Sequence, residues 1–178
     1  MDDPDMHQSL GVSIVIPNYN YGRYVGEAID SALAQSHAPV EVIVVDDGST
    51  DNSREVIERY GDRITAVFQQ NAGQPQACAT GFERSRYSIV IFLDADDVLL
   101  PEAAATVVAN WTPKLSKLQY RFETIDSESR RLGFFWPKYP SALGPERIRE
   151  DLLTKGEYVT PPTSGNAFSR DFLEAAAA

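Results

Sequence analysis

Short apolar runs alternate with stretches of helical periodicity over the first hundred residues of the chain. Each run is rich in Val and Ile, and turn-forming or acidic residues follow most of the runs. Between the runs, apolar residues recur at helical spacing, as at Val25, Ile29 and Leu33. Apolar strands that alternate with helices are typical of a parallel sheet covered on both faces. The sequence therefore predicts an α/β fold with a mainly parallel central sheet. We expect strands at 12–16, 40–45, 64–68 and 88–93, and helices at 24–35, 56–60 and 75–85.

The pattern changes after Pro101. Leu118, Tyr120 and Phe122 alternate with polar residues, which predicts a half-exposed strand. The run of Pro, Thr and Gly at 160–166 predicts irregular structure. The remaining predictions are helices at 102–111 and around 148–153, and a turn at 126–129.

An aromatic segment, Phe134-Phe135-Trp136-Pro137-Lys138-Tyr139-Pro140, follows the predicted turn. We interpret it as a loop whose rings anchor it to the body of the protein. The alternative is that Phe134, Phe135, Trp136 and Tyr139 stack against a bound sugar.

Acidic residues outnumber basic residues 26 to 16, which gives a net charge of −10. Such a chain repels nucleic acid and anionic membranes, so we expect no nucleic-acid partner. A phosphate-bearing ligand would need local cations, a helix N-terminus or a bound metal ion. No apolar run is long enough for a membrane span, and the acidic start, residues 1–5, is unlike a signal peptide, so we expect a cytoplasmic protein. The single cysteine, Cys78, excludes an internal disulfide and is interpreted as a small buried apolar residue.

Three polar segments come directly after predicted strands: residues 17–20, 46–51 and 94–97. Because the carboxyl ends of parallel strands share one edge of a sheet, ligands bind in the crevice at that edge. Segments nearly 80 residues apart can therefore meet in one site.

Asp94 and Asp96 belong to the last of these segments. In an extended stretch, side chains two positions apart point the same way, which brings the two carboxylates together. At about 4–5 Å, their repulsion costs roughly 1–4 kcal/mol. A hard divalent cation, Mn²⁺ or Mg²⁺, would remove that cost and keep positions open for phosphate oxygens. The alternative is an acidic, solvated loop.

Asp46 and Asp47 precede Gly48, Ser49 and Thr50. Turn formation and helix capping need only one acidic or hydroxyl group, so the doubled Asp suggests a contact with a base or ribose. Tyr19 could offer a ring face to a nucleobase, although a loop Tyr more often serves packing.

The ordered motifs at 12–20, 44–51 and 92–97 closely resemble those of the inverting family 2 glycosyltransferases, which have a GT-A fold, a Rossmann-type sandwich. Asn71-Ala72-Gly73-Gln74 and Gly81-Phe82 fit the same pattern. The resemblance covers residues 12–102 well. Thr163-Ser164-Gly165-Asn166-Ala167-Phe168 resembles the acceptor-side segment of the family with lower specificity.

The resemblance implies transfer of a sugar, with inversion, from a nucleoside diphosphate donor, UDP-linked, to a saccharide or glycoconjugate acceptor. Tyr19 and Asp47 would contact the nucleobase, and Asp46 would support them near the ribose. Asp94 would lie near the sugar and the ribose, and Asp96 would be the principal metal ligand. The residues assigned to nucleotide-sugar binding are Pro17, Tyr19, Asp46, Asp47, Asp94, Ala95 and Asp96, with Asp94 and Asp96 as ligands of Mn²⁺ or Mg²⁺.

Two features depart from the family pattern. Many relatives carry a polar pair where this chain has Cys78-Ala79, which puts donor contacts from that helix in doubt. No residue matches the general base, because Asp171 and Glu174 are better explained as charges at the start of a helix. We therefore divide the chain into a polar tail (1–10), a nucleotide-sugar-binding half (11–100) and an incomplete acceptor-side half (101–178).

Two other functions stay open. Residues 89–99 also resemble the first motif of haloacid-dehalogenase-type phosphatases, in which Asp94 would attack phosphorus and Asp96 would be the acid. That fold should place this strand early in the chain. The missing base supports a third possibility, a non-catalytic nucleotide-sugar-binding domain.

Overall fold

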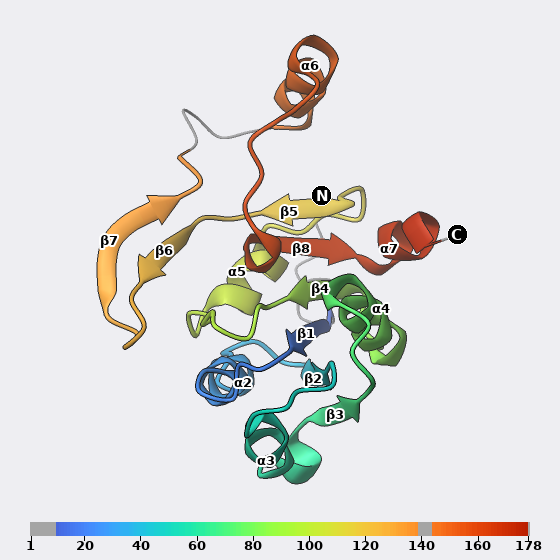
Figure 1. The fold of residues 1–178 in the computed structure, drawn as a ribbon. Helices are drawn as coiled ribbons and strands as arrows, with labels where there is room; N and C mark the ends of the chain where they lie inside the picture. Colours follow the sequence, from blue (N-terminus) through green and yellow to red (C-terminus); the bar gives the residue numbers. More distant parts are fainter. Residues whose placement is uncertain (1–9, 139–143, 178) are drawn as a thin grey trace.

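The computed structural model describes residues 10–138 and 144–177 as an α/β fold around a six-stranded sheet (Figure 1). All but the last residue of the predicted polar tail therefore lies outside the described residues. The strands of the main sheet are β1 (Val12–Asn18), β2 (Val40–Asp46), β3 (Thr65–Phe68), β4 (Ile89–Phe92), β5 (Lys117–Gln119) and β8 (Asn166–Ser169), and a two-stranded ribbon contains β6 (Phe122–Ile125) and β7 (Arg131–Trp136). The helices are α2 (Val25–Leu33), α3 (Ser53–Glu58), α4 (Gln74–Arg84), α5 (Ala103–Ala109), α6 (Pro145–Lys155) and α7 (Arg170–Ala177), with 3₁₀ turns η1 (Gly61–Arg63) and η2 (Thr163–Gly165).

The main sheet has the strand order β3-β2-β1-β4-β8-β5 and is mostly parallel, as predicted. Strands β1 to β4 run parallel to one another, and β8 lies antiparallel between β4 and β5. Asn18 pairs with Asp46, and Val15 pairs with Phe92. This register brings the carboxyl ends of β1, β2 and β4 to the same edge of the sheet.

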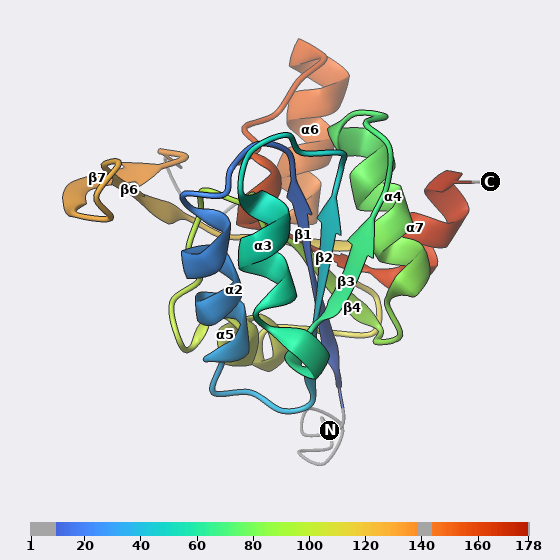
Figure 2. The ribbon, with the colours of Figure 1, turned by 60° about the horizontal axis from the view of Figure 1, so that its bottom comes forward.

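Apolar side chains fill both faces of the sheet because the strands are apolar throughout. Alternate residues of β1 belong to different clusters: Ile14 and Ile16 pack with α2 and α5, whereas Val15 packs with α4. Figure 2 shows α2 and α3 on one side of β1–β3 and α4 on the other. Burying one such side chain stabilises the fold by roughly 1.5–3 kcal/mol. Helix α4 approaches closely because Gly81 has no side chain; a Cβ there would lie 2.3 Å from Val15 Cγ1.

The predicted strand around Leu118, Tyr120 and Phe122 is two strands in different sheets. Leu118 lies in β5, at the edge of the main sheet, and Phe122 lies in β6. Tyr120 stands between them and donates its backbone N–H to Gly165 O at 3.0 Å. Side-chain alternation is the same on both sides of this break, so the sequence pattern contained no signal for it.

The interpretation of the aromatic segment as an anchored loop is wrong for its described part. Residues 131–136 form β7, and Phe134, Phe135 and Trp136 are 67%, 52% and 49% exposed. The backbone of this segment pairs with β6, and all six residues are exposed. Residues 139 and 140 of that segment, Tyr139 included, lie outside the described residues.

The ribbon contacts the body of the protein at its tip. Ser129 Oγ donates to Glu27 Oε2 at 2.6 Å, and Arg23 Nη2 donates to the carbonyl of Ser127 at 3.1 Å. Both partners belong to the start of α2 or the loop before it. The predicted turn at 126–129 is confirmed, since Ser129 N donates to Asp126 O at 2.9 Å.

The segment 160–166 is less irregular than expected. Residues 163–165 form η2, and Asn166 is already the first residue of β8. Asn166 Nδ2 donates to the carbonyl of Pro162 at 2.7 Å, which stabilises the bend before the strand. The helix expected around Asp171 and Glu174 is confirmed as α7.

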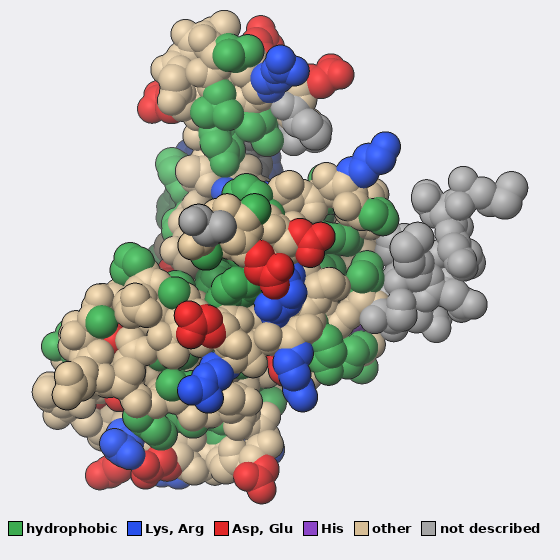
Figure 3. Space-filling model, turned by 90° about the vertical axis from the view of Figure 1, so that its right-hand side faces the viewer, with side chains coloured by type: hydrophobic (Ala, Val, Ile, Leu, Met, Phe, Trp, Pro, Cys, Tyr) green, Lys and Arg blue, Asp and Glu red, His purple; other side chains and the backbone are tan. Residues whose placement is uncertain are grey.

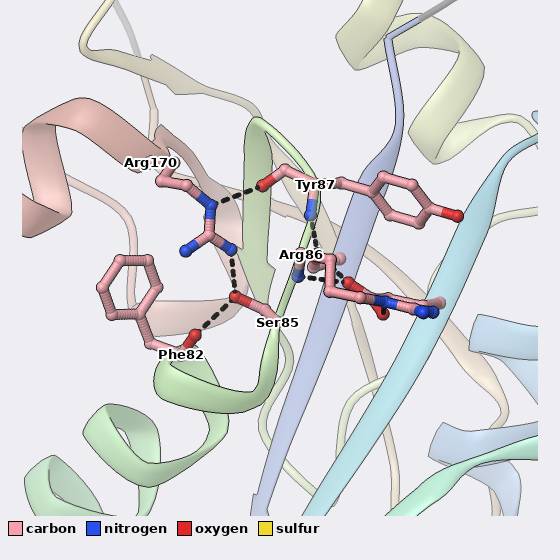
Figure 4. A network of polar contacts seen from close by, with 7 residues as sticks. Phe82, Ser85, Arg86, Tyr87 and Arg170 are labelled. Carbon is pink, nitrogen blue, oxygen red and sulfur yellow. Dashed lines mark hydrogen bonds and ion pairs between the residues drawn. The ribbon is translucent and has the colours of Figure 1, made fainter.

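A polar network at the amino-terminal edge of the sheet joins α7 to the loop between α4 and β4 (Figure 4). Arg170 donates to the carbonyl of Tyr87 at 3.1 Å and to Ser85 Oγ at 2.6 Å. Its guanidinium also lies over the ring of Phe82, 4.9 Å from the centroid. These contacts fix the position of β8, which directly precedes Arg170.

Acidic and basic side chains are interspersed on the face shown in Figure 3. Among the described helices, none is both long enough and apolar enough to cross a bilayer.

Candidate functional site

A cleft of about 500 Å³ opens at the carboxyl edge of the sheet. It is lined by the last two residues of β1, by residues that follow β1, β2, β3 and β4, and by the start of α4. The structure thus brings together the three polar segments that the sequence predicted would meet. The predicted binding residues in its lining are Pro17, Tyr19, Asp47, Asp94, Ala95 and Asp96, that is, all except Asp46.

Asp46 lies beneath the cleft instead of in its wall. The residue is 4% exposed, and its carboxylate accepts hydrogen bonds from Asn18 Nδ2 at 2.8 Å and from Ser49 Oγ at 2.5 Å. The backbone N–H of Ser49 also donates to it, at 3.2 Å. Asp46 therefore holds the loop after β2 against the end of β1, whereas its predicted place near a ribose stays a prediction.

Asp47 is 2% exposed and ties down the loop that precedes α4. Its carboxylate accepts from Gln69 Nε2 at 2.7 Å, from Ala72 N at 2.9 Å and from Gly73 N at 2.8 Å. Burial alone would raise the pKa of Asp47, but these three hydrogen bonds outweigh burial and lower it. The group is an anion with room for one further donor.

Tyr19 lines the cleft and is 45% exposed, so its ring is accessible to a ligand and is not buried in the core. The next residue, Asn20, has a φ of 60° and joins the loops after β1 and β2. Asn20 Oδ1 accepts from Thr50 N at 2.7 Å, and Asn20 N donates to Ser49 Oγ at 2.8 Å. The backbone that carries the Tyr19 ring is therefore held in place while the ring stays accessible.

Residues 94–97 form a turn, closed by a hydrogen bond from Asp97 N to Asp94 O at 3.0 Å. The expectation of an extended stretch here was wrong, because this bond bends the chain directly after β4. Asp94 and Asp96 nevertheless both line the cleft. Asp94 is half-buried and Asp96 is exposed.

Negative charge is crowded in this acidic turn, residues 94–97. Burial raises the pKa of Asp94, and the charges of Asp97 and Asp96 raise it further, against hydrogen bonds with Ser164 and Gln74. Burial and the charge of Asp96 likewise raise the pKa of Asp97. Burial and like charges therefore both disfavour the ionised carboxylates at this place, and a bound cation would favour them.

The donor set suits a hard divalent cation but does not complete its coordination. Among the described residues, no group of three or more His, Cys, Asp and Glu side chains is arranged to hold a metal ion. Asp94 and Asp96 offer carboxylate oxygens, which Mg²⁺ and Mn²⁺ prefer. Such ions keep several positions for water and phosphate oxygens, so these residues fit a metal that arrives together with a diphosphate.

Several lining residues were not among those that the sequence analysis assigned to binding: Asn18, Tyr21, Asn71, Gly73, Gln74 and Ala77. Gln74 matters most, since its Nε2 donates to Asp94 Oδ1 at 2.7 Å and links α4 to the acidic turn. Its place in the 71–74 motif was the only sequence signal for it.

Cys78 lies one residue beyond Ala77 in α4 and is half-buried. Burial and the charge of Asp94 raise the pKa of its thiol to about 11, so the group is neutral at physiological pH. The interpretation as an apolar residue fits that environment better than a role as a cation or anion contact.

The sequence analysis found no match for the general base, and four acidic residues of the acceptor-side half, Asp126, Glu157, Asp171 and Glu174, do not line the described cleft. Asp126 is bonded to Arg130 in the ribbon, and Asp171 lines a groove at the opposite edge of the sheet. Glu157 is exposed after α6, and Glu174 lies 3.7 Å from Arg170.

Comparison with known proteins gives one consistent result. The model of the family described as Glycosyl transferase family 2 matches residues 13–174. An uncharacterized glycosyltransferase of Nostoc sp. is 39% identical over 175 residues, which cover 93% of this chain and 52% of that protein. One from Rickettsia typhi is 36% identical over 129 residues, covering 71% of this chain and 41% of that protein. The chain thus spans about half the length of these relatives or less.

Solved structures with the same fold include glycosyltransferases with bound nucleotides. TarS of S. aureus with UDP-GlcNAc has a TM-score of 0.51 at 28% identity, over 56% of this chain and 30% of that one. The mannosyltransferase PcManGT of Pyrobaculum calidifontis with GDP-Man and Mn²⁺ has a TM-score of 0.54 at 26% identity, over 60% and 34%. Glucosyl-3-phosphoglycerate synthase of Mycobacterium tuberculosis, at 20% identity and a TM-score of 0.58, matches in fold over 92% of this chain and 58% of that one. The predicted GT-A-like fold is confirmed.

Proposed function

Because the chain belongs to glycosyltransferase family 2, we propose that its cleft binds a UDP-linked sugar together with Mn²⁺ or Mg²⁺ and transfers the sugar, with inversion, to a saccharide or glycoconjugate hydroxyl. The observation that carries this proposal is the position of the acidic turn. Asp94 and Asp96 line the same cleft as Tyr19 and Asp47, at the edge of the sheet where ligands bind in open α/β folds.

The nucleoside end of the donor is assigned to the side of the cleft formed after β1 and β2. The exposed ring of Tyr19 offers a stacking face for a base. Asp47 keeps one acceptor position beyond its three protein hydrogen bonds, enough for one N–H of a uracil ring. Asp46 lies beneath the cleft, and its hydrogen bonds with Asn18 and Ser49 hold the end of β1 and the loop after β2 together.

The diphosphate end is assigned to the acidic turn. Asp94 and Asp96 would hold the cation, which supplies Lewis acidity to the departing nucleoside diphosphate when it is bound. Gln74 holds Asp94 from α4, so that the carboxylate keeps its orientation toward the cleft. An acceptor hydroxyl would attack the anomeric carbon from the side opposite the diphosphate. Its proton would go to a general base, and Asp126, Glu157 and Asp171 do not line the described cleft.

The solved structures support the ligand class. TarS binds UDP-GlcNAc, and PcManGT binds GDP-Man with Mn²⁺. The two differ in base and in sugar, so they support a nucleoside diphosphate sugar more strongly than UDP itself. The choice of UDP rests on the resemblance at Tyr19 and Asp47.

The phosphatase alternative is not favoured. Its fold should place the acidic strand early, but β4 is the fourth strand along the chain and lies beside β1 within a sheet that matches glycosyltransferases. A non-catalytic nucleotide-sugar-binding domain would bind the same ligand in the same cleft, and it would differ from a glycosyltransferase only in transferring no sugar.

Calorimetric titration with UDP, in Mn²⁺ and in chelator, tests the proposal. We expect binding in Mn²⁺ and a loss of at least tenfold in affinity in chelator, since the acidic turn otherwise repels the diphosphate. Equal affinity in the two conditions would refute the metal bridge. Parallel titrations with GDP and ADP measure the preference for uracil, and release of phosphate from small phosphomonoesters would identify a phosphatase.

A further inference from the structure

The acidic turn is supported from behind by a residue 70 positions further along the chain. Ser164 lies in η2, directly before β8, and is 6% exposed. Its Oγ accepts the backbone N–H of Asp94 at 2.9 Å. The residue thus contacts the turn at its first backbone group, where the chain leaves β4 and bends.

Ser164 is itself held firmly. Gly165 N donates to Pro162 O at 3.0 Å, and Asn166 Nδ2 donates to the same carbonyl at 2.7 Å. A Cβ on Gly165 would lie 2.4 Å from Pro161 Cβ, which shows how closely the segment is packed. The hydroxyl therefore approaches the acidic turn from a rigid support.

We propose that Ser164 is a positioning residue, which keeps the acidic turn in the bend that points Asp94 and Asp96 into the cleft together. This inference rests on the proposed function, because its consequence is tighter binding of the cation and diphosphate. Ser164 does not line the cleft, so it acts through Asp94 and not by touching the ligand. The acceptor-side half of the chain thereby contributes to the donor site.

The experiment compares Ser164→Ala with Ser169→Ala. Ser169 is the last residue of β8, and its Oγ accepts Phe172 N at 3.2 Å, at the opposite edge of the sheet. Each variant loses one hydroxyl, Ser164→Ala directly before β8 and Ser169→Ala at the far end of that strand. The measurements are the affinity for UDP in Mn²⁺, the affinity for uridine, and the melting temperature.

We expect Ser164→Ala to lose about three- to tenfold in UDP affinity in Mn²⁺, the effect of one hydrogen bond, while uridine affinity stays unchanged. Ser169→Ala should leave both affinities unchanged. Equal UDP affinities in the two variants, or equal losses for UDP and uridine in Ser164→Ala, would overturn the proposal, because a general loss of structure affects both ligands.

A second pair of variants at Ser164 separates the loss of the hydroxyl from a folding defect. Ser164→Thr and Ser164→Val have the same shape and differ in the hydroxyl, so UDP should bind more tightly to the Thr variant. No difference between them would contradict the proposal. If the unaltered chain bound UDP equally with and without Mn²⁺, the proposed function itself would have failed, before any variant was measured.

Discussion

Asp96 is the exposed member of the acidic turn, and its side chain is available to a cation. Asp96→Asn keeps the size of the side chain and removes its charge. We expect at least a tenfold loss of UDP affinity in Mn²⁺ and no change in uridine affinity, since uridine carries no phosphate.

Calorimetry checks this expectation, with Asp62→Asn as a matched control. Asp62 lies in η1 and is also exposed, but it does not line the cleft. A similar loss in both variants would mean that total charge, and not the acidic turn, governs binding.

Asp47, unlike Asp96, is buried and holds the loop before α4 through three hydrogen bonds. Asp47→Ala leaves the Gln69 amide and the N–H groups of Ala72 and Gly73 without their acceptor, and each such group costs about 1–3 kcal/mol if it stays buried. We therefore expect a lower melting temperature and weaker binding of uridine, even without phosphates.

Thermal unfolding and a uridine titration measure the two effects separately. Asp47→Asn is the control for shape. Unchanged uridine affinity in Asp47→Ala, with the fold intact by circular dichroism, would remove Asp47 from the nucleobase site.

At the scale of elements, the polar network at the start of β4 connects that strand to β1 and β2 (Figure 4). Glu41 accepts from Ser13 Oγ at 2.6 Å, from Arg86 N at 2.6 Å and from Arg86 Nε at 2.9 Å. Burial would raise the pKa of Glu41, but these hydrogen bonds and the Arg86 charge lower it below 4.5. A lowered folded-state pKa stabilises the fold when the pH is above the unfolded value, and this stabilisation is lost as the pH falls through the folded value.

Glu41→Gln should therefore lower the free energy of unfolding at neutral pH by about 1–3 kcal/mol. The difference from the unaltered chain should shrink as the pH falls below 4.5. Urea unfolding at a series of pH values tests this, with the exposed Glu58→Gln as control. A difference that does not depend on pH would show that Glu41 acts through shape and not through its charge.

The ribbon of β6 and β7 is an element whose apolar residues are not covered by the described parts of the chain. Phe134 is 67% exposed, whereas Ile91 of β4 is fully buried. Phe134→Ala should change the free energy of unfolding by less than about 1 kcal/mol, and Ile91→Ala should cost about 2–5 kcal/mol. Urea unfolding compares the two. A large loss in Phe134→Ala would mean that the ring is buried in solution.

At the scale of the whole molecule, donor binding and transfer separate along the chain. Among the described residues, those that line the cleft all precede residue 98, and Asp126, Glu157 and Asp171 are not among them. A base typically contributes 10²- to 10⁴-fold to such a reaction. We expect this chain to bind UDP with Mn²⁺ but to transfer sugar very slowly, and a chain extended to the length of the relatives to be faster by that factor.

Single-turnover assays with a panel of UDP-sugars measure transfer directly. Full-rate transfer by residues 1–178 would place the base within them, and Asp126, Glu157 and Asp171 would then be tested by substitution with Asn or Gln.

The sequence alone determined the α/β class, the succession of the first four strands along the chain, and the meeting of the segments after β1, β2 and β4 at one edge of the sheet. It could do so because apolar runs report burial on both faces of a sheet, and because parallel strands must place their carboxyl ends together. Only the tertiary structure decided the rest. The separation of Leu118 and Phe122 into different sheets, and the contact of Ser164 with Asp94, depend on hydrogen bonds between segments far apart in the chain. The exposure of Phe134 was also decided by the tertiary structure. An aromatic residue is equally compatible with a covered and an uncovered strand, and the elements that pack against the strand decide between the two.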